Sequence, residues 1–310
     1  MYVGFDIGGT TIKHGILDEY GTILEQGSIG TEYEPEAFYK SLLKIIEAAQ
    51  AKYQIKGIGI SAPGIVQKDG YMLTAGAIRP LYGENFKQKL ALFTSLPVTV
   101  ENDANAVAIA EKWIGNATDM ENYLCLVLGT GVGGGIVING KVYRGSHGMA
   151  GEFGWMMIDK LPETGNLEDV SINKRTAIVG GLVRLYNDAQ LEQSPEEFVP
   201  VSDAREIFTL AENGDTLAIA ITKQFYVDLS VGLVNLISCF DPEAILIGGA
   251  VSANQFFHQE LQKTLEEVEK RHASINYLRG KTIAPVLPTK LKNNAGLIGA
   301  VYQVHQVVSK

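Results

Sequence analysis

The sequence predicts an α/β protein built from two lobes of similar construction. Two apolar segments, residues 2–8 and 124–128, each run into a loop of Gly and Thr, and a second apolar strand leaves each loop. Strand-like segments alternate with segments of helical periodicity along the chain, which is typical of α/β folds. A strand meander followed by helices occurs in both halves, which indicates a duplicated architecture.

The first half is predicted to form a three-stranded meander followed by alternating helices and strands. Asp18-Glu19-Tyr20-Gly21 forms the turn between the second and third strands. Apolar residues at helical spacing predict a helix from Pro35 to Tyr53. Ser61-Ala62-Pro63-Gly64 breaks the next strand, and after a further helix and strand another helix is expected from about Ala104 to Trp113. The expected strands are residues 2–8, 11–17, 22–29, 55–60 and 98–100.

The second half repeats this order, with Asn139-Gly140 as a strong hairpin signal. Its strands are expected at residues 124–128, 135–138, near 142, 244–247 and 281–286, and its helices at 172–187, 215–239, 255–272 and 294–308. We expect an N-terminal lobe of residues 1–115, joined by the C-terminal helix 291–310, and a C-terminal lobe of residues 116–290. A hinge is expected near residues 115–122.

Composition excludes several classes of protein. The net charge is −9 and the chain has no run of Lys and Arg, which argues against a nucleic-acid partner. The first residues lack the features of a signal peptide, and no uninterrupted apolar stretch is long enough to span a bilayer. Cys125 and Cys239 lie in apolar segments and are predicted to be small core residues in a reducing compartment. We therefore expect a cytoplasmic protein without a membrane partner.

The two Gly/Thr loops predict a phosphate-binding site. A loop rich in Gly can turn its N–H groups and Thr hydroxyls onto a phosphate, because no Cβ holds the ligand away. Asp6 ends the strand before the first loop, where its carboxylate could hold a hydrated Mg²⁺ or could bond its own turn. Lys13 could reach a phosphate or could be an ordinary polar residue of a half-exposed strand.

Three further segments carry candidate binding groups. Asn102-Asp103 lies where a strand ends and a helix begins, so the pair could cap the helix or could orient a sugar hydroxyl and accept its proton. Glu152 lies on a glycine-rich segment and could bridge hydroxyls of a polyol, while Trp155 could stack on a sugar or fill a core. Gly248-Gly249 fits a close approach of backbone to adenine or ribose, although a tight turn would have the same pattern.

These motifs together resemble the ROK family of sugar kinases and repressors, and the resemblance spans nearly the whole chain. It implies the duplicated actin-like, ribonuclease-H-like ATPase fold, with two lobes around a cleft. The motifs are Phe5-Asp6-Ile7-Gly8-Gly9-Thr10, Ser61-Ala62-Pro63-Gly64, Glu101-Asn102-Asp103-Ala104-Asn105, residues 128–154 and Ile247-Gly248-Gly249.

The resemblance also implies a mechanism that uses ATP and Mg²⁺. Asp103 is similar to the general base that takes the proton of a sugar's primary hydroxyl, which attacks the γ-phosphoryl group of ATP. Asp6 would hold Mg²⁺ through water. The implied sugar-binding residues are Asn102, Asp103, Glu152, Gly64, Trp155 and Glu168. The implied nucleotide-binding residues are Asp6, Gly8, Gly9, Thr10, Thr11, Lys13, Thr130, Gly131, Gly133, Gly248 and Gly249.

The chain departs from the family pattern at two places. Many members hold a structural zinc with a His and three Cys, but here Trp155 replaces the His and residues 156–180 contain no Cys. We therefore predict no zinc. Residues 75–81 are small or apolar where glucose-specific relatives often carry Asn-Leu and Trp. A smaller pocket lip there would suit a β-glucoside such as cellobiose.

The expected activity is phosphorylation of the 6-hydroxyl of a hexose or β-glucoside by ATP. N-acetylmannosamine and fructose are alternative substrates of the same reaction. A repressor is not expected, because only five residues precede Asp6 and leave no room for a DNA-binding segment. A sugar sensor without catalysis is disfavoured by the presence of Asp6, Asp103 and both loops. A homodimer that closes on its sugar is the expected assembly.

Overall fold

The computed structural model describes residues 1–309 and divides into two compact units. Unit 1 contains residues 1–125, residues 135–150 and the chain from Thr289 onward. Unit 2 contains residues 126–134 and 151–288. Contacts thus group residues 116–125 and 135–150 with unit 1, whereas the sequence suggested a boundary near residue 115. That lobe boundary stays a prediction.

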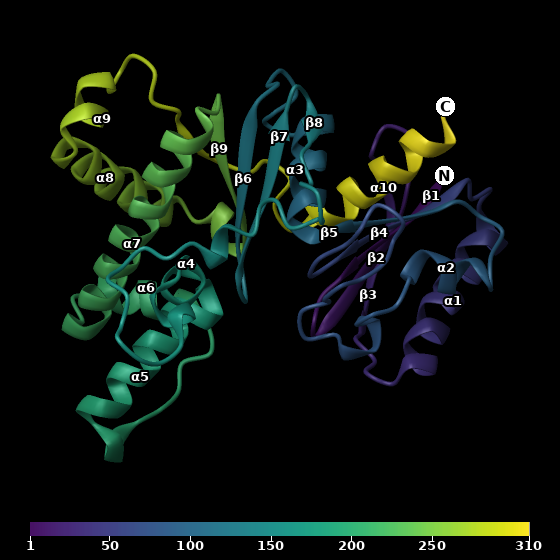
Figure 1. Ribbon diagram of the computed structural model, residues 1–310. Coiled ribbons are helices and arrows are strands. Elements are labelled where there is room, and N and C mark those ends of the chain that lie inside the picture. The colour runs from purple at the N-terminus through teal and green to yellow at the C-terminus, as the bar shows by residue number, and fades with distance from the viewer. Residues whose placement is uncertain (310) are drawn as a thin grey trace. The chain divides into compact units, whose positions relative to one another are not determined.

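Unit 1 is organised around a five-stranded mixed sheet in the order β3-β2-β1-β4-β5 (Figure 1). The predicted meander is confirmed, since β1, β2 and β3 pair antiparallel, and β4 and β5 then add in parallel. The pairing places Asp6 opposite Lys13 on one side and Ser61 on the other. The strands are β1 (Tyr2–Ile7), β2 (Thr11–Leu17), β3 (Ile23–Gly30), β4 (Gly57–Ala62) and β5 (Val98–Asn102).

The two faces of this sheet are covered by different helices. One face packs against α1, whose Phe38, Leu42 and Ile46 are spaced for a single apolar stripe and are fully buried. The other face packs against α10, which contacts β1, β4 and α3. The helices of unit 1 are α1 (Pro35–Lys52), α2 (Phe86–Ala91), α3 (Asp103–Ile114) and α10 (Ala295–Val308). The predicted C-terminal helix therefore forms and packs with the N-terminal strands.

Glycines allow α10 to approach the sheet closely. A Cβ on Gly59 of β4 would lie 2.0 Å from the backbone oxygen of Ala300. A Cβ on Gly299 of α10 would lie 1.9 Å from the backbone oxygen of Ala106 in α3. Both contacts are with backbone, which cannot rotate away. The small residues at these positions therefore set the distance at which α10 packs.

The second sheet has the order β10-β9-β6-β7-β8, and the division between the units runs through β6 and β7. Its strands are β6 (Tyr123–Leu128), β7 (Val132–Ile138), β8 (Lys141–Val142), β9 (Ala244–Gly249) and β10 (Val286–Pro288). The α-helices of unit 2 are α4 (Ile172–Thr176), α5 (Arg184–Gln193), α6 (Ala204–Glu212), α7 (Thr216–Phe240), α8 (Gln255–Arg271) and α9 (Ala273–Leu278).

Some boundaries in the second half differ from the predicted ones. The helix expected over residues 172–187 is broken, because α4 is followed by a π-helix at Ile178–Val183 and only then by α5. The adjacent glycines Gly180 and Gly181 lie in that break. The strand β7 begins at Val132 rather than residue 135, and β10 lies at residues 286–288 rather than 281–286. Helices α6 and α9 were not predicted.

One helix, α7, is long and apolar enough to cross a membrane by length and composition. In this structure its residues Phe225, Leu229 and Leu233 are buried, and it contacts α4, α6 and α8. A core helix passes the same length and composition criteria. The apolar character of α7 is therefore explained by packing within unit 2.

We predict that Gly59→Ala destabilises unit 1, because the added methyl group would collide with the backbone of α10. Overpacking of this kind typically costs about 1–3 kcal/mol and sometimes more. Urea unfolding followed by the fluorescence of Trp113, which packs 4.8 Å from Tyr302 of α10 between ring centroids, measures the effect. The matched control is Gly30→Ala, whose Cβ would meet nothing within 4 Å. Equal unfolding midpoints for the two variants would contradict this account of α10 packing.

Candidate functional site

Asp6 is held at the end of β1 by three neighbours. Ser61 Oγ donates a hydrogen bond to its Oδ1 at 2.9 Å, and Lys13 Nζ lies 3.8 Å from its Oδ2. A Cβ on Gly296, in the first turn of α10, would lie 2.5 Å from Asp6 Oδ1. The carboxylate thus lies at the positive end of a helix dipole. Burial raises the pKa of Asp6, and Ser61 and Lys13 oppose that rise.

The turn Gly8–Thr11 after β1 directs its carbonyl groups toward the protein. Thr31 Oγ1 donates to Gly8 O at 2.7 Å, the Thr31 N–H donates to Thr10 O at 3.0 Å, and Tyr33 donates its hydroxyl to Gly9 O. Within the described chain, the N–H groups of Gly9 and Thr10 have no protein partner. Two N–H groups beside exposed Thr hydroxyls are a suitable cradle for a phosphate oxygen.

Asn102 and Asp103 form the junction between β5 and α3. Asn102 caps the helix, since its Oδ1 accepts the N–H of Asn105 at 3.0 Å. Its Nδ2 donates to Gly64 O at 2.9 Å and to Asp103 Oδ1 at 3.1 Å. Asp103 Oδ1 also accepts the N–H of Ala104 at 2.8 Å. Asn102 therefore caps the helix, while Asp103 supplies a carboxylate whose position is fixed by two donors.

Gly64 can adopt the conformation that brings it to Asn102 because it lacks a side chain. Its φ is +93°, and a Cβ there would lie 2.3 Å from Thr74 O. The left-handed region is accessible to Gly at little cost. The sequence motif Ser61-Ala62-Pro63-Gly64 was predicted to end a strand, and here it also supplies a carbonyl group to the candidate site.

Glu101 anchors this junction, a role that the sequence analysis missed. Its side chain is buried and forms an ion pair with Arg144, with Arg144 Nε 3.1 Å from Oε2. Glu101 Oε1 also accepts the backbone N–H of Asn102 at 3.1 Å and Asn105 Nδ2 at 3.1 Å, while Gln303 Nε2 lies 3.3 Å from Oε2. An acidic residue at the end of a predicted strand, directly before a polar pair, is the sequence signal that could have indicated it.

The structure buries three of residues 75–81 in the core. Ala75, Ile78 and Leu81 are fully buried in the hydrophobic core of unit 1. The apolar character of these three residues follows from packing, while the smaller pocket lip stays a prediction. Ala77 is exposed, and its Cβ lies 3.4 Å from the position of a Cβ on Gly9. This segment therefore borders the Gly8–Thr11 turn.

The second Gly/Thr loop lies in unit 2 and is held by residues 173–180. Gly129 N donates to Gly131 O at 2.9 Å within the loop. Asn173 Oδ1 accepts the N–H of Val132 at 2.8 Å and would lie 2.9 Å from a Cβ on Gly131. The π-helix contributes N–H groups, since Ile178 donates to Gly129 O and Gly180 to Thr130 O. The break in the predicted helix is thus the feature that supports the loop. Gly133 follows as part of β7.

Gly249 ends β9 in a conformation that requires glycine. Its φ is +91°, and a Cβ there would lie 2.0 Å from Leu128 O. Its own carbonyl oxygen accepts Ser252 Oγ at 2.7 Å, and Gly248 before it is buried. The glycine pair therefore lies beside the end of β6, which leads into the Gly129–Gly131 loop.

Glu152, Trp155 and Glu168 lie in unit 2 but differ in exposure. Glu152 is half-buried, and burial raises its pKa above the usual range of a glutamate. Trp155 is 53% exposed and Glu168 is exposed on a short 3₁₀ helix. Trp155 is therefore not a core residue, and its backbone N–H donates to Glu152 O at 3.1 Å. An exposed indole remains available for stacking on a ligand.

The donor set fits a magnesium–phosphate complex better than an all-protein metal cage. Among residues 1–309, no group of three or more His, Cys, Asp or Glu side chains is arranged to hold a metal ion. Mg²⁺ is commonly held by one or two carboxylates together with substrate phosphates and water. Asp6 beside the Gly8–Thr11 turn meets that requirement. Cys125 is buried and Cys239 is exposed, so the expected core position holds for Cys125 alone. The absence of zinc stays a prediction.

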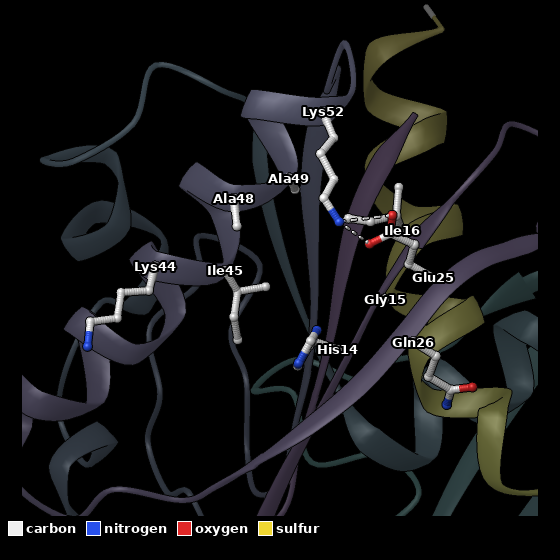
Figure 2. A pocket seen from close by; sticks show the side chains of 10 residues that line it. All are labelled: His14, Gly15, Ile16, Glu25, Gln26, Lys44, Ile45, Ala48, Ala49 and Lys52. Carbon is white, nitrogen blue, oxygen red and sulfur yellow. Dashed lines mark hydrogen bonds and ion pairs between the residues drawn. The ribbon is translucent and has the colours of Figure 1, made fainter.

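A separate cavity of about 220 Å³ lies between α1 and the strands β2 and β3. Figure 2 shows His14 pointing into it, with the Lys52–Glu25 ion pair close by. Burial lowers the pKa of His14, because it disfavours the charged form of the ring. None of the residues predicted to bind sugar or nucleotide lines this cavity.

Unit 1 therefore brings together Asp6, Lys13 and the Gly8–Thr11 turn, and likewise Gly64, Asn102 and Asp103. Unit 2 contains the remaining predicted residues. Of these, Thr130, Gly131, Gly133, Gly248 and Gly249 lie around the ends of β6, β7 and β9, and Glu152, Trp155 and Glu168 lie on the segment after β8.

Comparison with known proteins agrees with this organisation. A β-glucoside kinase of Listeria monocytogenes is 35% identical over 303 residues, which cover 97% of this chain and 96% of that protein. A solved Listeria monocytogenes protein, whose name offers N-acetylmannosamine kinase as its activity, superposes with a TM-score of 0.84 at 33% identity and 99% coverage of both chains. A Streptomyces griseus ROK family glucokinase, solved with glucose and AMPPNP, gives a TM-score of 0.81 at 30% identity and covers 98% of this chain and 99% of its own.

These structures confirm the predicted α/β fold of the duplicated actin-like class. The model of the ROK family matches residues 2–307, nearly the full length. The chain belongs to the ROK family.

Proposed function

We propose that this protein is an ATP-dependent sugar kinase that phosphorylates the 6-hydroxyl group of a β-glucoside or of glucose. The kinase class is supported by relatives named β-glucoside kinase and glucokinase, at 33–35% identity over nearly the whole chain. N-acetylmannosamine is the alternative substrate, on the strength of the Listeria structure. The observation that carries the proposal is the Asp103 carboxylate, which two donors orient at the start of α3.

Asp103 is the proposed general base. Its Oδ1 is fixed by the Ala104 N–H and by Asn102 Nδ2, so the carboxylate needs little reorganisation to accept a proton. The proton of the sugar 6-hydroxyl passes to Asp103 as the oxygen forms its bond to the γ-phosphorus of ATP. The bond from that phosphorus to the β,γ-bridging oxygen breaks, and ADP leaves with the electron pair.

Asp6 and the Gly8–Thr11 turn are proposed to hold the phosphates from unit 1. The N–H groups of Gly9 and Thr10 and the hydroxyls of Thr10 and Thr11 would donate to phosphate oxygens. Lys13 is already shared between Asp6 and the carbonyl oxygen of Asn293, so we assign it mainly to positioning Asp6. Asp6 would hold Mg²⁺ through water, and the bound ion would supply positive charge beside the phosphates.

The proposed nucleotide residues of unit 2 are Thr130, Gly131, Gly133, Gly248 and Gly249. They lie around the ends of β6, β7 and β9, where Gly249 has the backbone geometry that only glycine adopts without strain. The proposed sugar-binding residues are Asn102, Asp103, Gly64, Glu152, Trp155 and Glu168. Asn102 offers amide donors, and ionised Glu152 would accept hydrogen bonds from sugar hydroxyls.

We predict that Asp103→Asn lowers kcat for glucose or cellobiose by about 10²–10⁴-fold, the usual contribution of general-base catalysis. Asn removes the proton acceptor with little change in size, and the Asn102 cap on α3 is retained. ADP release in a coupled assay measures the effect. Asp119→Asn, which makes the same charge change at an exposed position, is the control. An unchanged kcat for Asp103→Asn would show that another group is the base.

We predict that sugar binding weakens as the pH falls through the raised pKa of Glu152. Burial disfavours the charged carboxylate, so protonation begins at a higher pH than for an exposed Glu. Once protonated, the side chain loses an acceptor, and KM for the sugar rises. KM measured between about pH 5 and pH 8 tests this. Glu152→Gln should give a high KM without this pH dependence, while the exposed Glu163→Gln should follow the wild type.

We predict that Gly131→Ala weakens Mg-ATP binding about tenfold, because its Cβ would lie 2.9 Å from Asn173 Oδ1 and displace the group that holds Val132. Calorimetry gives the dissociation constant, and urea unfolding reports the stability of the loop. A Cβ on Gly129 would meet nothing within 4 Å, so Gly129→Ala should keep the wild-type unfolding midpoint. Unchanged Mg-ATP affinity in Gly131→Ala would contradict the assignment.

A further inference from the structure

Unit 1 contains a second cavity. Its lining includes none of the residues proposed above to bind sugar or nucleotide. Its volume is about 320 Å³, and its walls are residues 66–69 and residues 144–148. The two segments are in direct contact, since a Cβ on Gly148 would lie 2.8 Å from Val66 O. The φ of Gly148 is +82°, so this approach uses a conformation that favours glycine.

The cavity lies beside the candidate sugar-phosphorylating residues. Asn102 Nδ2 donates to Gly64 O at 2.9 Å, and Val66 in the cavity wall is two residues farther along the chain. Two residues span at most about 7 Å. A molecule with one end at Asn102 and Asp103 could therefore extend past Gly64 into this cavity.

Glu101 contacts both the wall of the cavity and the residue before the candidate base. Arg144 lines the cavity and is committed to Glu101, which is 4% exposed. Glu101 in turn accepts the backbone N–H of Asn102 at 3.1 Å. A buried ion pair with several hydrogen bonds fixes its members in place. The position of the cavity relative to Asp103 is therefore set by a rigid network within unit 1.

The lining is suited to a neutral molecule with many hydroxyl groups. It offers donors from Lys68, Ser146 and His147, an acceptor from Asp69, and both from Gln67. Among the described residues that line it there is no Phe, Tyr or Trp, and Val66 is the one with a branched apolar side chain. Hydroxyl groups donate and accept, so they match this mixed set of side chains.

We propose that this cavity is a subsite for the second sugar ring of a β-linked disaccharide whose first ring is phosphorylated at Asp103. The proposal rests on the sugar-kinase function and specifies its substrate class. The second ring would form hydrogen bonds with Gln67, Lys68, Asp69, Ser146 and His147. Glucose has no second ring, so the subsite separates disaccharides from glucose.

The test compares kcat/KM for cellobiose and for glucose in the same enzyme. Lys68 and His147 are exposed, so Lys68→Ala/His147→Ala should keep the fold. We expect this double variant to lower kcat/KM for cellobiose about tenfold or more and to keep that for glucose within about twofold. Ser146→Trp, which fills the cavity, should lower the cellobiose value further. Lys40→Ala on α1, which does not line the cavity, is the control and should resemble the wild type.

The inference is overturned if the wild type phosphorylates glucose but not cellobiose, or if the variants lower both values equally. A preference for salicin over cellobiose that survives Ser146→Trp would also overturn it. The kinase function stands in each of these cases. If no sugar is phosphorylated, the proposed function fails. Calorimetry then decides the subsite alone: cellobiose binding that Ser146→Trp weakens supports it, and binding equal in both proteins overturns it.

Discussion

The close packing of α10 on β4 and α3 is the constraint on which the organisation of unit 1 depends. The backbone of Ala300 lies where a Cβ of Gly59 would be, and the backbone of Ala106 lies where a Cβ of Gly299 would be. This packing places the first turn of α10 against Asp6 and places Gln303 beside Glu101. One helix therefore supports both groups of candidate site residues in this unit. Its residues are nearly three hundred positions away from Asp6 along the chain.

The carboxylates of Glu101 and Asp103 in unit 1 have different roles because their surroundings differ. Glu101 is buried, ion-paired with Arg144 and surrounded by donors, so its hydrogen-bonding capacity is used within the protein. Such a group positions its neighbours at the cost of its own desolvation. Asp103, two residues later, receives donors from Asn102 and Ala104 at the surface end of α3. Glu101 and the candidate base Asp103 are thus close in sequence, but their carboxylates have different surroundings and different roles.

The two Gly/Thr loops have similar sequences, yet different partners hold them. In unit 1 the carbonyl groups of the Gly8–Thr11 turn are bound by Thr31 and Tyr33, which follow β3. In unit 2 the carbonyl groups of Gly129 and Thr130 are bound by the π-helix, and Asn173 holds the next N–H. π-helical turns inside α-helices occur frequently at functional sites. The two loops share a sequence pattern, while each half uses its own neighbours to support it.

Local sequence patterns are sufficient to predict most elements and the residue types of the site. Pro35 and the spacing of Phe38, Leu42 and Ile46 predict α1, Asn139-Gly140 predicts the β7–β8 hairpin, and Asn102-Asp103 predicts a helix start. These signals depend on neighbours within a few residues of each other. The fold class could therefore be predicted well.

The role of each polar residue depends on contacts that form when the chain folds. Glu101, Asn102 and Asp103 follow one another in the sequence but have different partners. Glu101 pairs with Arg144, and Asn102 donates a hydrogen bond to Gly64. The helix break at Gly180-Gly181 supports the Gly129–Gly131 loop, because N–H groups of the π-helix donate to carbonyl oxygens of that loop. Ala75, Ile78 and Leu81 proved to be core because they pack in one cluster with residues of β1, β4 and α1. In each case the deciding contact joins segments far apart in sequence, which local patterns do not encode.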